Sequence, residues 1–413
     1  MDFKECYLSD ICKYKKEKIA TKEIKREDYI STENMLADKQ GIGSLSDVPK
    51  SGNIDRFENK DVLISNIRPY FKKIWLSDRN GGASPDVLVF QADQTKVIPE
   101  YLYYLLSQDD FFAYMVQTSK GTKMPRGDKN AIMQYKIMLF NNKEKQWKLV
   151  NILSSIDKKI QINKLIISNL EQLSQTLFKQ WFIDFEFPNE EGKPYKSSGG
   201  EMVESELGEI PKGWVSSNIS EVCLLNKGSY SKKDEWSFIN YLDTSSITNN
   251  SISNIQLIDV QKEKVPSRAK RKLLPNDIVY STVRPNQYHY GLIKNPLTNM
   301  VASTGFTVIR SKGKYPNDLI YMWLTQKEVT QHLQSVAEQS TSAYPSIKAD
   351  DIGKIKILIP PKKLIDTLND IISNNHNQIW GYQQENKKLS ELRDTLLPKL
   401  LSGEIEIPDD LEM

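Results

Sequence analysis

The sequence predicts a duplicated α/β (α+β) fold, in which two similar globular domains are each followed by one long helix. Three observations lead to this prediction. An apolar pattern with alternating spacings of four and three residues runs from Leu149 to Trp181, the same pattern returns 219 residues later, and short sequences of the first half recur in order in the second half. An ordered series of internal matches is the signature of a repeat architecture.

The apolar pattern forms a seam longer than four heptads. Such a seam is typical of a helix that pairs with another, and we expect the two helices to form an antiparallel coiled coil. Two ordinary core helices are the alternative, although about 50 Å at 1.5 Å per residue exceeds most globular helices. The seam positions are Leu149, Leu153, Ile156, Ile160, Asn163, Ile167, Leu170, Ser174, Leu177 and Trp181, followed by Leu368, Ile372, Asn375, Ile379, Tyr382, Asn386, Leu389, Arg393, Leu396 and Leu400.

Polar residues on the seam have a separate predicted role. Asn163 and Asn375 are expected to fix the register of the pair rather than to add stability. Ten apolar seam residues are expected to make the contact that spaces the two domains: Leu153, Ile156, Ile160, Ile167, Leu170, Leu177, Ile372, Ile379, Leu389 and Leu396.

Composition indicates a globular protein in a reducing compartment. Of 413 residues, 39% are hydrophobic and 26% are charged, and the formal net charge is only +3, so local clusters matter more than the total. Three cysteines and three histidines are too few and too scattered for a zinc site or a disulfide framework. No apolar run reaches membrane-spanning length and no signal-peptide core is present, which predicts a cytoplasmic location.

The first domain starts again after Trp214. Leu8-Ser-Asp-Ile-Cys12 is matched by Ile219-Ser-Glu-Val-Cys223, and Asp61–Pro69 is matched by Asp277–Pro285, while the offset drifts from 211 to 220. We therefore predict domains at residues 1–145 and 214–360, long helices at 146–183 and 361–403, a linker at 184–213 and a tail at 404–413. The linker assignment follows from its Pro, Gly, Ser and acidic residues without helical periodicity.

Several elements of the first domain can be placed. Strand-like runs occur at Val62–Ile67 and Val87–Phe90, and helical runs rich in aromatic residues occur at Tyr101–Leu106 and Phe111–Val116. We expect the aromatic residues of these helices to lie in the core rather than to stack on bases.

Catalytic motifs are missing from the sequence. There is no phosphate-binding Gly-x4-Gly-Lys-Ser/Thr motif and no Asn-Pro-Pro-Tyr-like tetrapeptide of the kind expected in an amino-methyltransferase. Asp93-Gln-Thr-Lys96 has one residue too many for the Asp/Glu-x-Lys arrangement of metal-dependent nucleases. Recognition is therefore the predicted task of the two domains.

Basic residues suggest what is recognised. The cluster Lys13–Arg26 is solvated surface by default and phosphate-binding as the second interpretation, while the cluster Lys262–Lys272, with Tyr, Asn and Gln nearby, suits a phosphate backbone beside base edges. Each repeat also has a strand ending in Arg-Pro, followed by residues that differ between the repeats. Arginine reads guanine and Asn or Gln reads adenine in the major groove, so we predict DNA contacts. The candidates are Arg68, Lys123, Arg126, Arg284, Gln287, Tyr288, Thr341 and Tyr344; a buried structural ion pair is the alternative for Arg68 and Arg284.

Three segments resemble the specificity subunits of type I restriction–modification systems. They are Leu389–Ile405 (LSELRDTLLPKLLSGEI), Gln172–Phe182 with its FKQWF sequence, and Gly208–Trp214 (GEIPKGW). The resemblance covers essentially the whole chain and includes the duplication. It implies a non-catalytic subunit whose two target recognition domains each read one half of a split DNA sequence, while the paired helices space the halves.

The same resemblance implies the partners. They are double-stranded DNA, methyltransferase subunits (two of them) and restriction subunits, and S-adenosylmethionine, ATP and magnesium would be held by those subunits and not by this chain. Two other classes remain open from the sequence: a two-headed scaffold that binds polypeptides, and an enzyme with an unrecognised active site.

Overall fold

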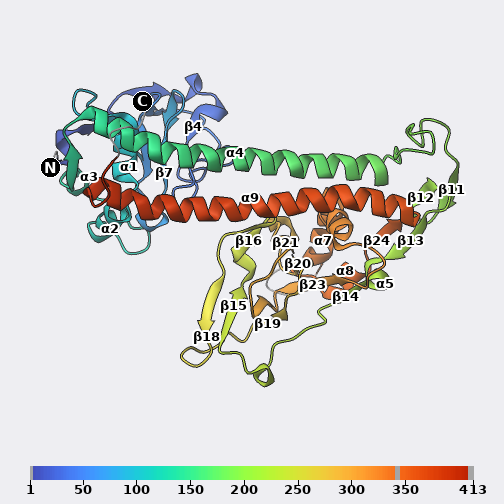
Figure 1. Ribbon diagram of the computed structural model, residues 1–413. Helices are drawn as coiled ribbons and strands as arrows, with labels where there is room; N and C mark the ends of the chain where they lie inside the picture. Colours follow the sequence, from blue (N-terminus) through green and yellow to red (C-terminus); the bar gives the residue numbers. More distant parts are fainter. Residues whose placement is uncertain (1–2, 340–344, 408–413) are drawn as a thin grey trace. The chain divides into compact units, whose positions relative to one another are not determined.

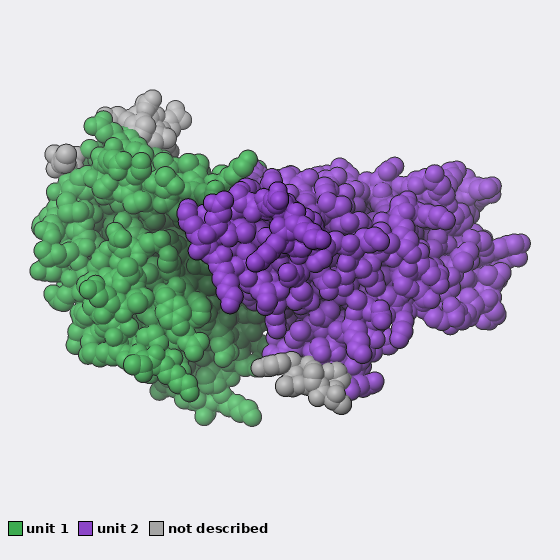
Figure 2. Space-filling model, turned by 90° about the horizontal axis from the view of Figure 1, so that it is seen from below, with its two compact units in different colours: residues 1–161, 387–413 green, residues 162–386 purple. Residues whose placement is uncertain are grey.

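The computed structural model describes residues 3–339 and 345–407 and contains two compact units. Unit 1 comprises residues 1–161 and 387–413, and unit 2 comprises residues 162–386 (Figure 2). Both boundaries between the units fall inside the two long helices (Figure 1). Each unit therefore contains one globular head and a part of each helix.

The long helices are α4 (Lys143–Phe182) and α9 (Lys362–Ser402), which start three residues before and one residue after the predicted positions. With 40 and 41 residues, each is about 60 Å long at 1.5 Å per residue. None of the twenty predicted seam positions is exposed. The mixed fold and the pairing of the helices are confirmed; the role of the seam in spacing the domains stays a prediction.

Polar contacts give the direction of the pairing in unit 2. In unit 2 the Asn163 side chain donates to Asn386 at 2.9 Å, and Asn375 donates to Ser174 at 3.1 Å. Numbers rise along α4 as they fall along α9, so the pairing is antiparallel. Both seam asparagines thus bond across the helix pair, as expected of residues that fix a register.

Head 1 lies in unit 1 and combines mostly antiparallel sheets with the short helices α1, α2 and α3. Its main sheet has the order β2-β9-β6-β7 and its second sheet the order β3-β5-β8-β4, while β1 pairs with β10. The strands are β1 (Phe3–Tyr7), β2 (Cys12–Tyr14), β3 (Lys18–Ala20), β4 (Tyr29–Ile30), β5 (Asn53–Phe57), β6 (Val62–Ser65), β7 (Ile74–Leu76), β8 (Gly81–Ala83), β9 (Val87–Ala92) and β10 (Lys136–Phe140); the helices are α1 (Pro99–Leu106), α2 (Asp109–Gln117) and α3 (Lys129–Met133).

Head 2 lies in unit 2 and repeats this arrangement. Its main sheet has the order β14-β23-β20-β21, its second sheet the order β18-β15-β22-β19, and β13 pairs with β24. The elements are β13 (Val215–Asn218), α5 (Ile219–Val222), β14 (Cys223–Leu225), β15 (Phe238–Leu242), β16 (Ile247–Thr248), β17 (Ser251–Ile252), β18 (Gln256–Asp259), β19 (Ala269–Lys272), β20 (Asp277–Ser281), β21 (Tyr290–Ile293), β22 (Met300–Ser303), β23 (Phe306–Ser311), α6 (Asn317–Leu324), α7 (Lys327–Glu338), α8 (Ala349–Gly353) and β24 (Lys356–Ile359).

The repeat predicted from the sequence is confirmed at the level of strand pairing. In head 1, β4 runs parallel to β8 while the other pairs are antiparallel, and in head 2 β15 runs parallel to β22 in the same way. Head 2 adds the strand β18 beside β15. The shared part is therefore a common framework, and the additions lie at its edge.

The core of head 1 contains the aromatic helices as predicted. Tyr101, Phe111 and Phe112 are buried with the apolar faces of β6 and β9. Leu149 and Leu153 of α4 and the leucines at 397, 400 and 401 of α9 belong to the same cluster. Head 1 is thus anchored on the helices within its own unit.

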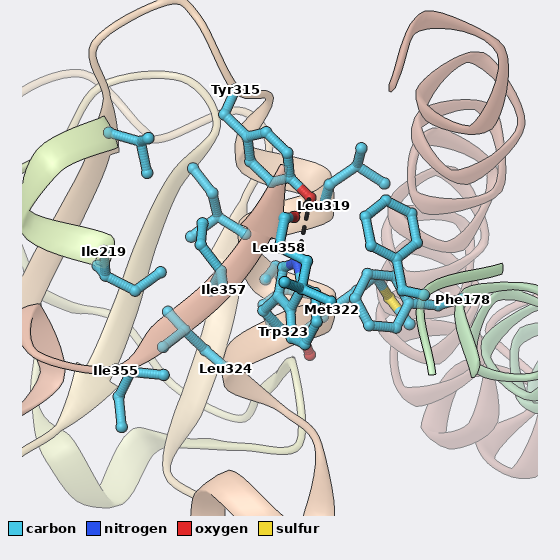
Figure 3. Packing of buried hydrophobic residues seen from close by; sticks show 14 of the residues in the cluster. Phe178, Ile219, Tyr315, Leu319, Met322, Trp323, Leu324, Ile355, Ile357 and Leu358 are labelled. Carbon is cyan, nitrogen blue, oxygen red and sulfur yellow. Dashed lines mark hydrogen bonds between the residues drawn. The ribbon is translucent and has the colours of Figure 1, made fainter. Parts of the chain in front are cut away.

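The core of head 2 is drawn in Figure 3. Tyr315 accepts a hydrogen bond from the Trp323 indole at 3.0 Å and donates to the carbonyl of Leu358 at 3.4 Å. Phe178 of α4 meets the Trp323 ring edge-on, with 5.1 Å between ring centroids. Helix α6 is buried along its whole length, which makes it the centre of this core.

The segment at 184–213 is not the unpacked linker that the sequence predicts. It forms the hairpin β11 (Met202–Ser205) and β12 (Gly208–Pro211), and Phe185, Phe187 and Ile210 are buried in the core of head 2. The Phe187 ring stacks on Trp214 at 5.3 Å. These aromatic residues stand singly among Pro, Gly and acidic residues, so no periodic pattern announces their burial.

Among the described helices, none combines the length and apolar character that would let it span a membrane.

Candidate nucleic-acid interface

The hairpin between β6 and β7 contains the first Arg-Pro motif. Residues 66–72, named here the first Arg-Pro turn, include a 3-10 helix at Pro69–Phe71. Arg68 before it and Lys72 after it both have φ of 49°. Left-handed backbone is uncommon for residues other than glycine, so this conformation is held by its surroundings.

Head 2 has the same turn between β20 and β21. Residues 282–288, the second Arg-Pro turn, contain a 3-10 helix at Pro285–Gln287, with φ of 48° at Arg284 and 57° at Tyr288. Two repeats thus keep two strained residues at corresponding positions. Strained backbone is concentrated at functional sites, where the surrounding structure determines it.

A second loop fixes each turn from its N-terminal side. In head 1 the amide of Arg68 donates to the carbonyl of Pro125 at 2.8 Å, and the amide of Gly127 donates to Asn66 at 3.1 Å. In head 2 the amide of Arg284 donates to Pro345 at 3.0 Å. The loops at 119–128 and 345–348 are named here the companion loops. In head 1 the turn and its companion loop are thus joined, which brings Arg68 near the loop that contains Lys123 and Arg126.

In head 1 all three candidate residues are exposed. Arg68 lies in the turn, and Lys123 and Arg126 lie in the companion loop. Arg126 pairs with Asp86 at 3.0 Å, whereas within residues 3–339 and 345–407 no carboxylate forms a salt bridge with Arg68. A buried structural ion pair is therefore the wrong interpretation of Arg68. Contact of these residues with DNA stays a prediction.

In head 2 the described candidates are also exposed. Arg284, Gln287 and Tyr288 lie on the second Arg-Pro turn, and 42% of the Tyr288 side chain is accessible. Arg284 is not buried, so the alternative of a buried ion pair is wrong here as well. Thr341 and Tyr344 lie outside the described residues.

Other cations at the first turn are used inside the protein. Lys39 and Lys72 both pair with Asp109, at 2.8 and 3.0 Å. Burial acts to raise the pKa of Asp109, but hydrogen bonds from the two lysines outweigh it and the pKa is lowered. Lys73 donates to the carbonyl of Thr32 at 2.6 Å, and burial lowers the pKa of this lysine. These residues fix the turn, while Arg68 and Lys123 extend its positive surface.

The two basic clusters are partly structural. Lys15, from the first cluster, is buried and pairs with Glu58 at 2.8 Å and with Asp61 at 3.2 Å, so the default interpretation as solvated surface is wrong for this residue. In the second cluster Lys272 pairs with Asp234. Lys18, Arg26 and Lys262 are exposed but also paired, with Asp55, Asp47 and Asp259 respectively.

The acidic residue of the Asp93–Lys96 segment has an ordinary structural role. Asp93 accepts hydrogen bonds from the backbone and the hydroxyl of Thr95, which lower the pKa of the Asp93 carboxyl. Over the described ranges, no three His, Cys, Asp or Glu residues are grouped so that they could hold a metal ion.

Sequence reasoning missed three exposed side chains on the two turns. Tyr70 and Phe71 are 49% and 39% exposed, and Asn286 at the position corresponding to Tyr70 is exposed as well. The sequence feature that could have indicated them is the difference between the residues that follow the two Arg-Pro pairs. Their exposure depends on the turn conformation, which the sequence alone does not reveal.

Comparison with known proteins shows to which family the chain belongs. The family model of the type I restriction modification DNA specificity domain matches residues 1–172 and 211–386, and the chain belongs to this family. A relative from Haemophilus influenzae, the type I restriction enzyme HindI specificity subunit, is 22% identical over 98% of this chain and 100% of its own length. The MjaIX specificity subunit of Methanocaldococcus jannaschii is 26% identical over 76% of this chain and 70% of its own.

A solved structure has the same fold. The S subunit of a type I restriction-modification system from M. genitalium aligns with a TM-score of 0.59, at 16% identity, over 97% of this chain and 96% of that one. The family match confirms the sequence-based assignment to type I specificity subunits.

Proposed function

We propose that this chain is the DNA-recognition subunit of a type I restriction–modification complex, in which each head binds one half of a split target. One observation carries the proposal: the same strained turn and companion loop occur in both heads, with different exposed side chains at corresponding positions. Two domains that recognise different DNA sequences require a common framework with different side chains on the loops that contact the bases. The matched family model, a DNA specificity domain, supports the same conclusion.

The exposed groups suit the grooves of DNA. Arg68 and Arg284 can bind phosphate or the O6 and N7 atoms of guanine, and Gln287 can form two hydrogen bonds with adenine. Lys123 adds the sequence-independent attraction that makes DNA binding depend on salt concentration. The chain contributes recognition and leaves the chemistry to its partners.

The long helices complete the proposal. Their seams set the distance between the half-sites, and their outer faces dock methyltransferase subunits, two of them, to which restriction subunits are added in the cytoplasm. S-adenosylmethionine, ATP and magnesium are held by those subunits. Inserting one helical turn in both α4 and α9 adds about 6 Å, so the preferred gap should lengthen by roughly two base pairs of ~3.4 Å. An unchanged gap would mean that the helices do not set the spacing.

The decisive experiment is methylation mapping in cells that express this chain with its methyltransferase partners. Sequencing that detects modified bases should reveal a split motif with a fixed gap. Replacing residues 1–145 by the corresponding domain of a relative should change one half of the motif, and replacing residues 214–360 should change the other. Methylation whose motif ignores both replacements would show that the heads are not the readers and would favour a scaffold function.

A further inference from the structure

Two aromatic side chains project from the tip of the first Arg-Pro turn. Tyr70 and Phe71 are 49% and 39% exposed, and their rings contact each other with 4.8 Å between centroids. The ammonium group of Lys73 lies 5.8 Å from the centroid of the Phe71 ring. Adjacent large apolar side chains exposed at a loop tip are informative, because such groups are normally buried or bind a partner.

The turn does not need these aromatic residues for its own structure. In head 2 the corresponding positions are Asn286 and Gln287, and the backbone is nevertheless the same. The amide of Phe71 donates to the carbonyl of Arg68 at 3.0 Å, and the amide of Gln287 donates to that of Arg284 at 2.9 Å. Polar side chains thus build the same turn, so the aromatic pair serves something outside the fold.

The aromatic tip is also held rigidly. The amides of Asp38 and Lys39 donate to the carbonyls of Phe71 and Lys72 at 2.9 and 3.0 Å, and the companion loop fixes the other side through Arg68. A fixed tip loses little conformational entropy on binding. The neighbouring exposed cations, Arg68 and Lys123, favour a polyanion as the ligand of this apolar pair.

We propose that Tyr70 and Phe71 determine specificity in head 1 by apolar contact with the methyl group of a thymine in the first half-site. This inference rests on the proposed function and specifies the kind of contact by which head 1 recognises a base. The C5 methyl of thymine is the apolar feature of the major groove, and aromatic side chains are suited to contact it. Head 2 carries amides at the same positions and reads its half-site by hydrogen bonds instead.

The test uses the full chain in complex with its methyltransferase partners. Affinity is measured for DNA in which each thymine of either half-site is replaced in turn by uracil, which lacks only the methyl group. For the unmodified chain, one replacement in the first half-site should weaken binding about fourfold, the effect of one buried methyl or methylene group. The matching replacements in the second half-site report on head 2.

The informative variant is Tyr70→Asn/Phe71→Gln, because the second turn shows that this backbone accepts these residues. It should bind uracil-containing and thymine-containing first half-sites equally, with the second half-site still recognised. Tyr7→Ala is the matched control, since Tyr7 is an aromatic residue of head 1 with 42% exposure at the end of β1. This control should keep the response to uracil.

Three outcomes overturn the inference. Uracil has no effect anywhere in the first half-site, or its effect persists in the double variant, or Tyr7→Ala abolishes it equally. Insertion of the rings between base pairs would be insensitive to the methyl group and would give the first of these results. In all three cases sequence-specific binding by the unmodified chain leaves the proposed function standing, whereas loss of such binding overturns both.

Discussion

Each head has a buried aspartate at the same position, and a different cation neutralises it in each head. Asp61, directly before β6, and Asp277, the first residue of β20, occupy corresponding positions. Both are buried, and each accepts a hydrogen bond of 2.7 Å from the backbone amide three residues earlier. In head 1 the neutralising cation is Lys15, beyond the end of β2. In head 2 it is Arg310 on β23, which binds Asp277 with two hydrogen bonds of 2.7 and 2.6 Å.

The attachment of each head to the helices shows the same divergence. Asp157 on α4 and His376 on α9 are 219 residues apart, which is the offset of the helical repeat. In unit 1, Asp157 accepts hydrogen bonds from Tyr104 at 2.7 Å and Arg393 at 2.9 Å. In unit 2, His376 lies 2.7 Å from Asp318, which also pairs with a buried lysine, Lys294, at 3.1 Å. The two residues thus occupy matching positions in the repeated helices, but the side chains that pair with them differ.

The largest expected effect comes from the deeper of these two attachments. Asp318→Ala leaves Lys294 and His376 buried without their carboxylate, and should lower the free energy of unfolding by about 3–5 kcal/mol. Asp157→Ala should cost about 1–3 kcal/mol, because the Asp157 side chain is 26% exposed and Arg393 keeps Asp394. Urea unfolding, with hydrogen exchange to follow each head separately, measures both. Equal losses would contradict the ranking by burial.

The next effect tests whether the two neutralising cations are interchangeable. Lys15→Asn introduces the residue that head 2 has at that position and should cost about 2–4 kcal/mol, since Asp61 is then buried without its cation. Adding Gln91→Arg places an arginine where head 2 has Arg310, and should recover part of the loss. The matched control is Gln91→Arg alone, which should be neutral or destabilising. Failure of the arginine to rescue the variant would show that the surroundings of the two aspartates differ.

These comparisons also show which features a sequence reveals. The seams of α4 and α9 and the aromatic faces of α1 and α2 were predictable, because burial on a regular element leaves a periodic pattern. The packing of Phe185 and Phe187 was not, since they follow the end of α4 and reach their partners through tertiary contacts alone. The Arg-Pro turns were recognisable as a repeated motif, but the exposure of Tyr70 depends on hydrogen bonds to distant loops.

A pH-dependent difference between the helices is expected to be smaller. Glu171 on α4 is largely buried, and this burial raises its pKa from 4.5 to about 7; the matching residue on α9 is Ser390. The folded state therefore holds a proton that the unfolded state releases, so stability falls as pH rises from about 4.5 to 7 and is level above.

Glu171→Gln should remove this dependence. At 1.36 kcal/mol per pKa unit, the variant should gain roughly 1–3 kcal/mol of stability at pH 8 and little at pH 4.5. Unfolding by urea at the two pH values checks this result. Ser390→Ala, at the matching position of the other helix repeat, is the control and should change stability by the same amount at both pH values. A gain that is equal at both pH values would exclude ionisation of Glu171 as its cause.

The smallest expected difference concerns Arg68 and Arg284, the arginines that precede the prolines of the two turns. Each stands at a left-handed position before proline and is exposed, so we expect alanine to keep the turn while it removes the side chain beyond Cβ. Arg284→Ala should weaken binding by ~1–3 kcal/mol if the guanidinium reads a base, and should relax specificity at one position of the second half-site only. Arg68→Ala should do the same at the first half-site. If instead both variants weaken all sequences alike and flatten the salt dependence, the arginines bind phosphate and the side chains at the tips of the turns carry the specificity.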